Sequence, residues 1–343
     1  MGKLHLADLI GGKAIRTQLT IAHGAARLHN RAMRHILFSG LAGCGKTTTA
    51  KAVSHLDDTP FFEISSESVR SSEDLARLFE RFPGDGYDPK TGEKIGEINP
   101  AIVFVDEAHR LTLKSEEMLG IAMENFRHTY MVGRGRNKRP QTAWVPEFTL
   151  ICATTKEGDL SKPFRDRFKF TMIFGSYSYE ESKLIVALHA NKKGIFISPE
   201  AIEEIAQRGR GTPRILVRYL DATHDFMSFM GKNKITADTA RAQFQLQGID
   251  HLGLTESDTI IMQELYDSES PKGLDSLAVK TNLDQRTIAE VNEPYLILLG
   301  FIERTKGGRV ITDKGAQHLA QRGLIEAPEK VEGGGRIIRR TEG

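Results

Sequence analysis

The sequence predicts an α/β domain built on a parallel sheet, followed by a small all-helical domain and a winged helix. Three observations support this order. Short apolar runs alternate with helical stretches up to about residue 176, helical periodicity alone continues to about residue 250, and two short strands around a Gly-Gly turn follow further helices. Strands that alternate with helices favour a parallel sheet covered on both faces. Short helices that lead into a terminal hairpin are typical of a winged helix.

The first domain, expected over residues 1–176, contains apolar runs that predict buried strands. These runs cover residues 36–39, 61–64, 101–105 and 148–153. Apolar residues recur at helical spacing over 16–31 and 73–79, so helices are expected there. A segment rich in turn-forming residues, 83–99, precedes the strand at 101–105 and predicts a surface loop or hairpin.

The second domain, expected over 177–250, shows helical periodicity only, and the third, over 251–322, adds a hairpin to its helices. The predicted helices of the second domain are 179–192, 198–208, 212–230 and 236–246. Those of the third are 258–266, 273–280 and 285–299, and its strands are 300–304 and 309–312. Glycine and proline in residues 323–343 predict a flexible tail.

The composition of the 343 residues limits the class of protein. With 39% hydrophobic and 27% charged residues, the chain has enough apolar material for several packed domains. No apolar run approaches the roughly 20 residues of a membrane span, and the first residues lack a signal-peptide pattern, so we expect a cytoplasmic protein. No disulfide is expected between Cys44 and Cys152. Because the net charge is only +2, any contact with nucleic acid must depend on local basic clusters.

A phosphate-binding loop is predicted directly after the first strand. The segment Gly40-Leu-Ala-Gly-Cys-Gly-Lys-Thr47 matches G-x-x-x-x-G-K-[ST] and lies between an apolar strand and a helical stretch. In such a loop, backbone N–H groups converge on phosphate oxygens, and the following helix N-terminus favours negative charge. We therefore predict that ATP and Mg²⁺ bind here, with Lys46 on the β and γ phosphates and the Thr47 hydroxyl on the metal. The residues expected around the phosphates are Gly43, Cys44, Gly45, Lys46, Thr47 and Thr48.

Two carboxylates follow the strand at 101–105. Asp106 and Glu107 stand where a buried strand would deliver both side chains to one edge of the sheet. We expect Asp106 in the Mg²⁺ shell and Glu107 as the base that orients and deprotonates the attacking water. Asp106-Glu-Ala-His109 also spells the box of another helicase superfamily. That superfamily needs an arginine motif, Q-x-x-G-R-x-x-R, which Gln207-Arg-Gly-Arg210 matches poorly.

Longer segments of the chain resemble the RuvB family, the AAA+ motors that drive branch migration of Holliday junctions. The resemblance extends from about Leu6 to Thr312. It implies a P-loop AAA+ domain with a parallel sheet, an all-helical lid, a C-terminal winged helix, and a hexameric ring that translocates on DNA. The matching segments are 106–111, 116–119, 122–124, 146–151, 153–155, 165–168, 210–214, 293–297 and 300–305.

The resemblance also implies roles for residues around the nucleotide. Thr155, with Thr154 as the neighbouring candidate, is similar to the polar sensor that positions water. Arg167 resembles the arginine finger from an adjacent subunit, where a cation stabilises charge on the transferring phosphoryl group. Arg214, after Pro213, resembles the second sensor, which couples the γ-phosphate to the lid. Residues alone leave ordinary ion pairs and core packing as alternatives. The positions that match an adenine pocket are Leu9, Ile10 and Tyr177.

Two basic segments resemble family surfaces that contact DNA or a partner. The wing of the family binds double-stranded or four-way DNA, and here its candidate phosphate contacts are Arg304, Lys306 and Arg309. A wing used for protein docking is the alternative. The segment 130–145 resembles the hairpin that holds the junction-binding partner RuvA. Its basic residues are Arg134, Arg136, Lys138 and Arg139, and the apolar residues left for docking are Met131, Val132 and Trp144.

Three functions follow from these patterns. The first is a ring-shaped, ATP-driven DNA motor in branch migration. The second is a nucleotide-switched loader or scaffold that assembles another protein on DNA. The third is a motor that uses its basic hairpin on DNA in place of a RuvA-like partner. The segment 83–99, an insertion relative to the family, is either a contact surface or an inert hairpin.

Overall fold

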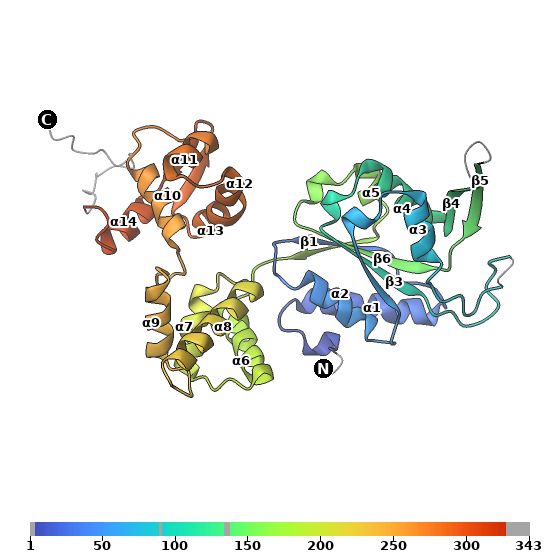
Figure 1. The fold of residues 1–343 in the computed structure, drawn as a ribbon, viewed down its shortest axis with the longest axis horizontal. Coiled ribbons are helices and arrows are strands. Elements are labelled where there is room, and N and C mark those ends of the chain that lie inside the picture. The colour runs from blue at the N-terminus through green and yellow to red at the C-terminus, as the bar shows by residue number, and fades with distance from the viewer. Residues whose placement is uncertain (1–3, 89–90, 134–137, 327–343) are drawn as a thin grey trace. The chain divides into compact units, whose positions relative to one another are not determined.

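A five-stranded parallel sheet forms the centre of the first of two units into which the chain divides (Figure 1). The computed structural model describes residues 4–88, 91–133 and 138–326. The first unit extends to Ile185 and also contains Gly211–Arg214. The strands lie in the order β2-β3-β6-β1-β7. Their bounds are Ile36–Gly40 for β1, Phe61–Ser65 for β2, Ala101–Asp106 for β3, Phe148–Thr154 for β6 and Phe170–Phe174 for β7.

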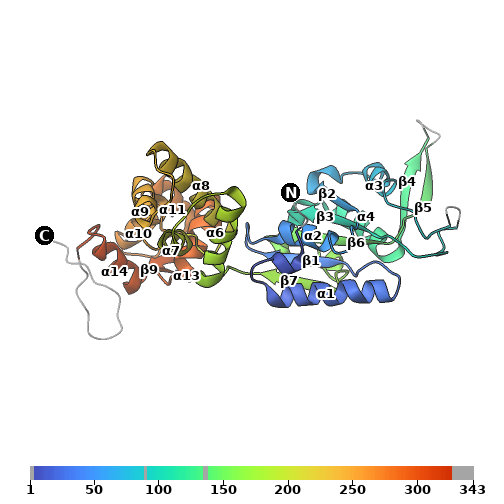
Figure 2. The same ribbon diagram turned by 90° about the horizontal axis from the view of Figure 1, so that it is seen from below.

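Alternate side chains of the central strands enter two separate cores. Phe38, Phe104 and Ile151 pack with helices α1 (Lys13–Leu28) and α2 (Lys46–Ser54). Leu37, Val103 and Leu150 pack with α3 (Ser72–Phe79), α4 (Leu113–Asn125) and α5 (Lys162–Arg165). Helices α1 and α3 lie on opposite sides of the sheet (Figure 2). The predicted parallel sheet, covered on both faces, is confirmed.

His35, directly before β1, is a buried histidine with a defined tautomer. Its Nδ1 accepts a hydrogen bond from the Leu150 N–H at 2.9 Å, so its Nε2–H donates to the Met123 carbonyl at 3.1 Å. The neutral ring therefore joins β6 to the end of α4. Burial lowers the pKa of His35 from 6.5 to about 4, although the Met123 hydrogen bond opposes this change.

This histidine predicts a pH dependence of stability. The unfolded chain binds a proton near pH 6.5 and the folded chain only near pH 4, so stability is full above pH 6.5 and is lost as the pH falls towards 4. The difference between these two pKa values corresponds to about 3 kcal/mol of unfolding free energy, at 1.36 kcal/mol per pKa unit. Urea unfolding of the wild type and of His35→Gln at pH 8, 7, 6 and 5 measures it. We expect a shallower pH slope in the variant, and equal slopes would contradict this origin.

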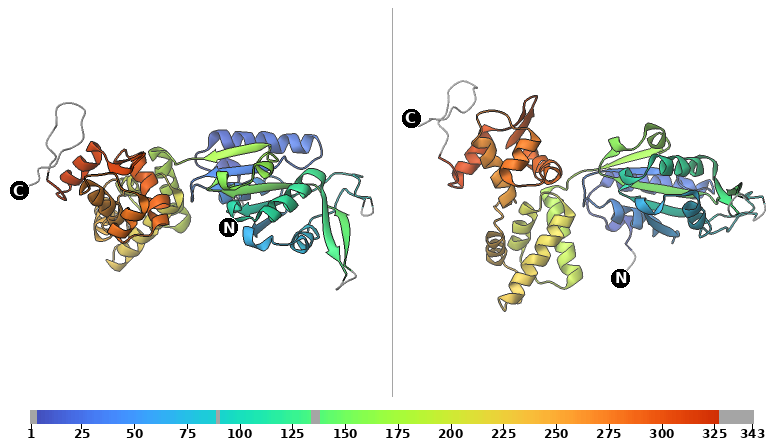
Figure 3. Two further views of the ribbon diagram at one scale, coloured as in Figure 1. Left: turned by 90° about the horizontal axis from the view of Figure 1, so that it is seen from above. Right: turned by 45° about the horizontal axis from the view of Figure 1, so that its top comes forward.

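A two-stranded hairpin, β4 (Arg127–Val132) and β5 (Arg139–Trp144), extends away from the sheet (Figure 3). Arg134 and Arg136, which were expected in its basic tip, lie outside the described residues. Lys138 and Arg139 are exposed. The part of the tip that the structure describes therefore presents positive charge to solvent.

The described part of the turn-rich segment 83–99 packs against the base of this hairpin. The ring of Tyr87 lies 5.3 Å from that of Trp144, and an added Cβ at Gly92 would meet the Trp144 indole at 2.6 Å. Lys94 forms an ion pair with Glu147 at 2.7 Å. Trp144 therefore packs against this segment and is half-buried. Of the three apolar candidates for partner docking, Met131 remains exposed and Val132 half-buried.

The second unit contains Val186–Arg210 and the chain from Ile215 onward. Its helical part is formed by α6 (Tyr179–Lys193) and α8 (Pro213–Phe229), which both begin in the first unit, and by α7 (Pro199–Arg208) and α9 (Ala237–Leu246). Its winged helix contains α10 (Glu256–Tyr266), α11 (Leu274–Thr281), α12 (Gln285–Thr287), a π-helix (Ile288–Asn292), α13 (Glu293–Leu298), β8 (Ile302–Thr305), β9 (Gly308–Ile311) and α14 (Asp313–Gln321). Among the described residues, no helix combines the length and apolar character that crossing a membrane requires.

The second unit contains one helix that was not expected, α14 (Asp313–Gln321), and departs from the expected helix pattern within residues 285–299. Residues 285–299 were expected to form one helix, but the π-helix at Ile288–Asn292 separates α12 from α13. Pro294 lies in the first turn of α13 and has no N–H for the preceding turn, which explains why regular α-helical bonding is interrupted here. Most of the predicted tail, 327–343, lies outside the described residues.

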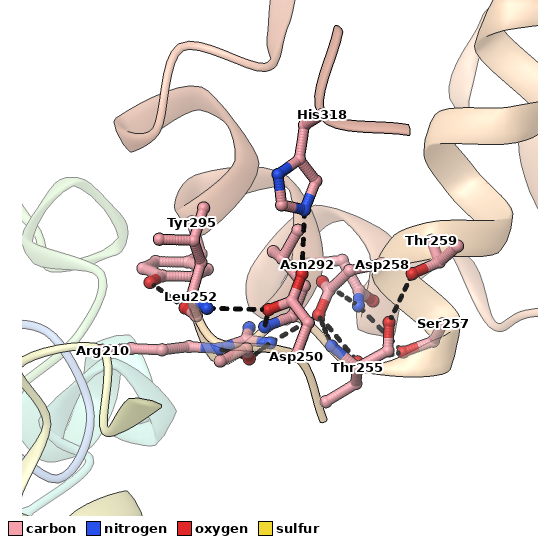
Figure 4. Close-up of polar contacts among 12 residues, drawn as sticks. Arg210, Asp250, Leu252, Thr255, Ser257, Asp258, Thr259, Asn292, Tyr295 and His318 are labelled. Atoms are coloured by element: carbon pink, nitrogen blue, oxygen red, sulfur yellow. Dashed lines mark hydrogen bonds and ion pairs between the residues drawn. The ribbon is translucent and has the colours of Figure 1, made fainter. Parts of the chain in front are cut away.

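Arg210 connects the helical part of the second unit to its winged helix (Figure 4). Its Nε and Nη2 donate to the Gly253 carbonyl at 3.0 and 2.7 Å, and Nη2 also pairs with Asp258. The guanidinium lies 4.4 Å from the centroid of the Tyr295 ring. Asp258 is 0% exposed and accepts a further hydrogen bond from Asn292 at 2.7 Å. A buried, fully engaged ion pair thus joins the two parts of this unit.

Candidate active site

The phosphate loop between β1 and α2 depends on two glycines in the left-handed backbone region. Gly43 and Gly45 have φ angles of +75° and +89°. An added Cβ at Gly43 would lie 2.9 Å from the Cβ of Arg214, and one at Gly45 would lie 3.1 Å from the Tyr177 hydroxyl oxygen. Both the backbone conformation and the close neighbours therefore require glycine at these two positions. Glycine is also the residue that lets a backbone approach a phosphate group closely.

Lys46 opens α2, and its ammonium group turns back into the loop. Its Nζ donates to the Gly40 and Leu41 carbonyls at 2.8 Å each, and the side chain is buried. The pKa of Lys46 is lowered, because the effect of burial is larger than the opposing effects of Cys44, Glu107 and Asp106. Because neutral carbonyls do not neutralise a buried ammonium group, the loop is suited to an anionic ligand such as a triphosphate.

Thr47 and Asp106, the two predicted metal ligands, lie next to each other. The Thr47 hydroxyl donates to Asp106 Oδ2 at 3.4 Å. An alcohol and a carboxylate are oxygen ligands that fit Mg²⁺, which otherwise keeps water and binds substrate phosphates. The residues present therefore fit the predicted metal.

Glu107 adopts a rare backbone conformation directly after β3. Its φ is +50°, and its N–H donates to Asp106 Oδ1 at 3.0 Å. A non-glycine residue in this region is strained, and such strain is concentrated at functional sites. Glu107 Oε2 lies 3.3 Å from His109 Nδ1, which also lies 3.1 Å from the hydroxyl of Thr154.

The polar sensor therefore has two neighbouring candidates in different environments. Thr154 is 0% exposed, and its hydroxyl contacts His109 and accepts from the Lys156 N–H at 3.0 Å. Thr155 is half-buried and directly follows the last residue of β6. The structure links Thr154 to Glu107 through His109, while Thr155 remains the position that the family resemblance favours.

The segment Gly211–Arg214 brings further predicted residues to the phosphate loop. Pro213 and Arg214 begin α8, and the Arg214 side chain lies against Gly43. Tyr177 receives support from both sides: its N–H donates to the Gly211 carbonyl at 2.8 Å and its hydroxyl donates to the Cys44 carbonyl at 3.3 Å. Arg214, with Lys46, also lowers the pKa of the Cys44 thiol, but burial outweighs them and raises it.

The remaining nucleotide-site candidates lie nearby or at the rim. Leu9 packs in the same core cluster as Tyr177. Ile10 is half-buried, and Thr48 is exposed in the first turn of α2. Cys44 in the loop and Cys152 in β6 are both buried and free, so the expectation of no disulfide is confirmed.

Arg167 lies away from its own phosphate loop. Its Nε lies 3.1 Å from Glu124 Oε1 on α4, and its Nη1 donates to the Pro163 carbonyl at 2.8 Å. A groove of about 1040 Å³ surrounds it, and its lining includes residues of α4, of the segment 29–35 before β1 and of the segment 163–169. None of residues 40–48 or 106–107 lines this groove. Within the described part of the chain, Arg167 is therefore not placed to act on a nucleotide bound by the same subunit.

Three family models match consecutive parts of the chain. The P-loop domain of the Holliday junction DNA helicase RuvB matches residues 3–174, the RuvB AAA lid domain matches 177–250, and the RuvB C-terminal winged helix domain matches 251–320. The chain belongs to the RuvB family. The predicted fold class, a P-loop AAA+ domain with a helical lid and a winged helix, is confirmed.

Relatives and solved structures agree with this assignment. The chain is 36% identical over 330 residues to the Holliday junction branch migration complex subunit RuvB of Thermobifida fusca, covering 96% of this chain and 89% of the relative. It is 36% identical over 321 residues to that of Ehrlichia chaffeensis, covering 93% of each. The solved RuvB branch migration motor of Thermotoga maritima superposes with a TM-score of 0.75 at 30% identity, covering 93% of this chain and 97% of the motor.

The candidate DNA contacts of this RuvB family member differ in how they are held. Arg304 and Arg309 both bind the carboxylate of Glu293, with Arg304 Nη2 at 2.8 Å and Arg309 Nε at 3.0 Å. Burial would raise the pKa of Glu293, but the two arginines outweigh it and keep the group ionised. Arg304 is 58% exposed and Arg309 16%, while Lys306 is exposed at the turn between β8 and β9. Arg304 and Lys306 are thus the accessible cations of the wing.

The wing predicts a graded set of DNA-binding defects. Lys306→Ala and Arg304→Ala are each expected to weaken duplex binding and to reduce the slope of log K against log salt by about 1. Arg304→Ala and Arg309→Ala are expected to affect folding as well, because each leaves the buried Glu293 short of a partner, so Lys306→Ala is the variant that tests phosphate contact alone. Fluorescence anisotropy over a salt series, with thermal unfolding of each variant, separates these effects. Unchanged salt slopes in all three variants would count against a wing that binds phosphate.

Sequence patterns did not reveal two residues that support these sites. Glu124 lies 43 positions from Arg167, and Glu293 lies 11 and 16 positions from its two arginines. Both occur within segments that resemble the family, but no local spacing indicates their partners. Their roles emerge only from the folded arrangement.

Proposed function

We propose that this protein is the ATP-driven motor of Holliday junction branch migration, acting as a hexameric ring on DNA. Support comes from the family assignment together with the phosphate loop, the paired Thr47 and Asp106, and the strained Glu107. The observation that carries the proposal is the position of Arg167, outside its own nucleotide site. A ring supplies each ATP with the guanidinium of the next subunit. The comparisons give no support to a loader or scaffold.

The residues of the chain then divide the hydrolytic work. Thr47 and Asp106 would hold Mg²⁺, which would supply positive charge to the triphosphate. Lys46 contributes a second fixed positive charge from the loop. Glu107 orients the attacking water and accepts its proton. Arg214 contacts the loop at Gly43 and lies in the first turn of α8. Loss of the γ-phosphate would therefore change the position of α8 and of the lid that it belongs to.

We place the DNA contacts and the partner on different parts of the chain. Arg304 and Lys306 bind duplex phosphates without reading base sequence. The β4–β5 hairpin docks a RuvA-like protein, since the relatives are named subunits of a branch migration complex. Because Trp144 is half-buried against the segment 83–99, this docking depends mainly on the exposed Met131, with Val132 beside it. The protein works where chromosomal DNA is found, the bacterial cytoplasm.

An assay of ATP hydrolysis and junction movement tests the proposed function. Turnover is measured without DNA, with linear duplex and with a four-way junction, while labelled arms report branch migration with and without a RuvA-like protein. We expect DNA to raise turnover and ATP to drive arm exchange, with Lys46→Ala inactive in both. Stimulated turnover with no movement under any partner condition would instead favour the loader. Arm exchange without the partner would favour a motor that uses its own basic hairpin.

A further inference from the structure

We propose that Glu124 is a positioning residue for the arginine finger: it holds the Arg167 guanidinium on α4 in the orientation that meets the neighbouring nucleotide. This inference rests on the proposed function, because it assumes that Arg167 acts across a subunit interface. Glu124 itself touches no nucleotide. Its effect passes through Arg167, so loss of Glu124 should matter only in the subunit that supplies the finger.

Three contacts fix the guanidinium. Nε lies 3.1 Å from Glu124 Oε1, Nη2 donates to Glu124 Oε2 at 3.5 Å, and Nη1 donates to the Pro163 carbonyl at 2.8 Å. Glu124 therefore faces the Nε edge of the planar group. An arginine has two N–H groups on each terminal nitrogen. Counted over the described residues, one N–H on Nη1 and one on Nη2 remain for an incoming phosphoryl group.

Gly120 completes the cradle one turn before Glu124 on α4. An added Cβ there would lie 2.9 Å from Arg167 Nε, 3.0 Å from Cζ and 3.1 Å from Cδ. The guanidinium thus rests directly on the helix backbone, where any larger residue would displace it. The absence of a side chain at 120 and the carboxylate at 124 act on the same group. Both are supplied by the rigid helix and neither by the loop that carries Arg167.

The charges of the groove explain why the finger needs this support. Arg31, Arg34 and Lys169 line the same groove and are cationic, so they repel the Arg167 guanidinium. Two other acids line the groove: Glu147 is paired with Lys94 at 2.7 Å, and Asp166 directly precedes Arg167 in the chain. Glu124 supplies the opposite charge at the Arg167 side chain itself. Arginine also has large rotamer freedom, and the ion pair with the Glu124 carboxylate restricts it before the neighbour arrives.

A mixture of two inactive variants isolates the effect. Arg167→Ala subunits keep Glu107 but lack a finger, whereas Glu107→Gln subunits keep the finger but cannot hydrolyse ATP. Activity in the mixture therefore arises where a Glu107→Gln subunit supplies Arg167 to an Arg167→Ala subunit. Glu124→Gln is added either to the finger donor or to the Arg167→Ala subunit. The steady-state kcat and KM for ATP are measured in each mixture.

We expect Glu124→Gln in the finger donor to lower the recovered kcat about tenfold, with little change in KM. In the Arg167→Ala subunit, the same change should leave the mixture unaffected, because there is no guanidinium to hold. Glu117→Gln in the donor is the matched control, since Glu117 is an exposed carboxylate on the same helix. Equal losses in both placements would show a general defect of α4 and overturn the inference. A higher kcat with the donor variant would show that Glu124 restrains the finger, and would overturn it too.

Gly120→Ala provides a second variant that favours folding, because alanine is the better helix former. We expect it to lower kcat when placed in the finger donor and to have no effect in the Arg167→Ala subunit. Full activity in both placements would contradict a cradle at this position. If the reference mixture itself recovers no activity, the shared nucleotide site of the proposed function fails. If it recovers and both donor variants match it, only the role of Glu124 fails.

Discussion

Arg167→Ala and Glu107→Gln proteins, each tested alone, are expected to hydrolyse ATP at less than about one-hundredth of the wild-type rate, and an equal mixture is expected to recover hydrolysis. The first variant lacks the cation that stabilises charge on the transferring phosphoryl group. The second lacks the base for the attacking water. In a head-to-tail ring assembled at random, about one interface in four combines an intact Glu107 with a neighbouring Arg167. Recovery to roughly that fraction of wild-type turnover, measured with DNA present, is the expected result.

The control for this experiment keeps the subunit number and removes the complementary interface. Arg167→Ala subunits are mixed with subunits that carry both changes, so no site meets an intact finger. This mixture should remain inactive at every ratio. An Arg167→Ala protein that retains most of its turnover would show that hydrolysis does not need the guanidinium of a neighbour.

The largest effect on stability is expected from Arg210→Ala in the second unit. Its removal leaves Asp258, which is 0% exposed, as a buried carboxylate that still accepts from Thr255 and Asn292 but has lost its cation. Breaking a buried pair from one side costs about 3–5 kcal/mol. Arg210→Lys should recover only part of this, because lysine cannot donate in a fork to Gly253 or stack on Tyr295 in the same way.

The chain has a single tryptophan, so the unfolding of the two units can be measured separately. Trp144 lies in the first unit, so its fluorescence follows that unit, whereas far-ultraviolet circular dichroism follows the helices of both. In Arg210→Ala, part of the dichroism signal should be lost at a lower urea concentration while the fluorescence midpoint stays in place. Arg286→Ala, which removes an exposed pair with Glu290, should change neither. If the dichroism and fluorescence transitions of Arg210→Ala both keep the wild-type midpoints, the pair has no such role.

The elements with strong local patterns were predictable from sequence. Of the four strands predicted to be buried, β1, β3 and β6 are buried, whereas β2 is a half-buried edge strand, so the prediction for 61–64 was wrong in burial. These strands and the phosphate loop are encoded by short apolar runs and a fixed glycine spacing, both of which are local properties. The edge strand β7 was missed, because Phe170–Phe174 alternates between the core and more exposed surface and resembles the lead into the lid. Helix α14, Asp313–Gln321, was missed because it follows a hairpin that already completes the winged-helix pattern.

The candidate site was predictable only in part, for a physical reason. Lys46, Thr47 and Asp106 belong to motifs whose residue spacing is typical of a nucleotide site, so their proximity in the fold could be predicted. The partners of Arg167, Arg304 and Arg309 are distant in sequence and are set by tertiary packing. Nor does any pattern show that the Trp144 indole packs against the segment 83–99. The roles of Thr155, Arg167 and Arg214 stay predictions until the variants are measured.

The two buried cysteines have a practical consequence. Burial raises the pKa of both thiols, and the thiolate is the form that reacts with maleimides. A cysteine introduced on the winged helix, for example by Arg286→Cys at an exposed position, would therefore carry a fluorescent dye almost alone, without removal of the native residues. Single-molecule energy transfer between such dyes could then follow the wing of one subunit through its cycle.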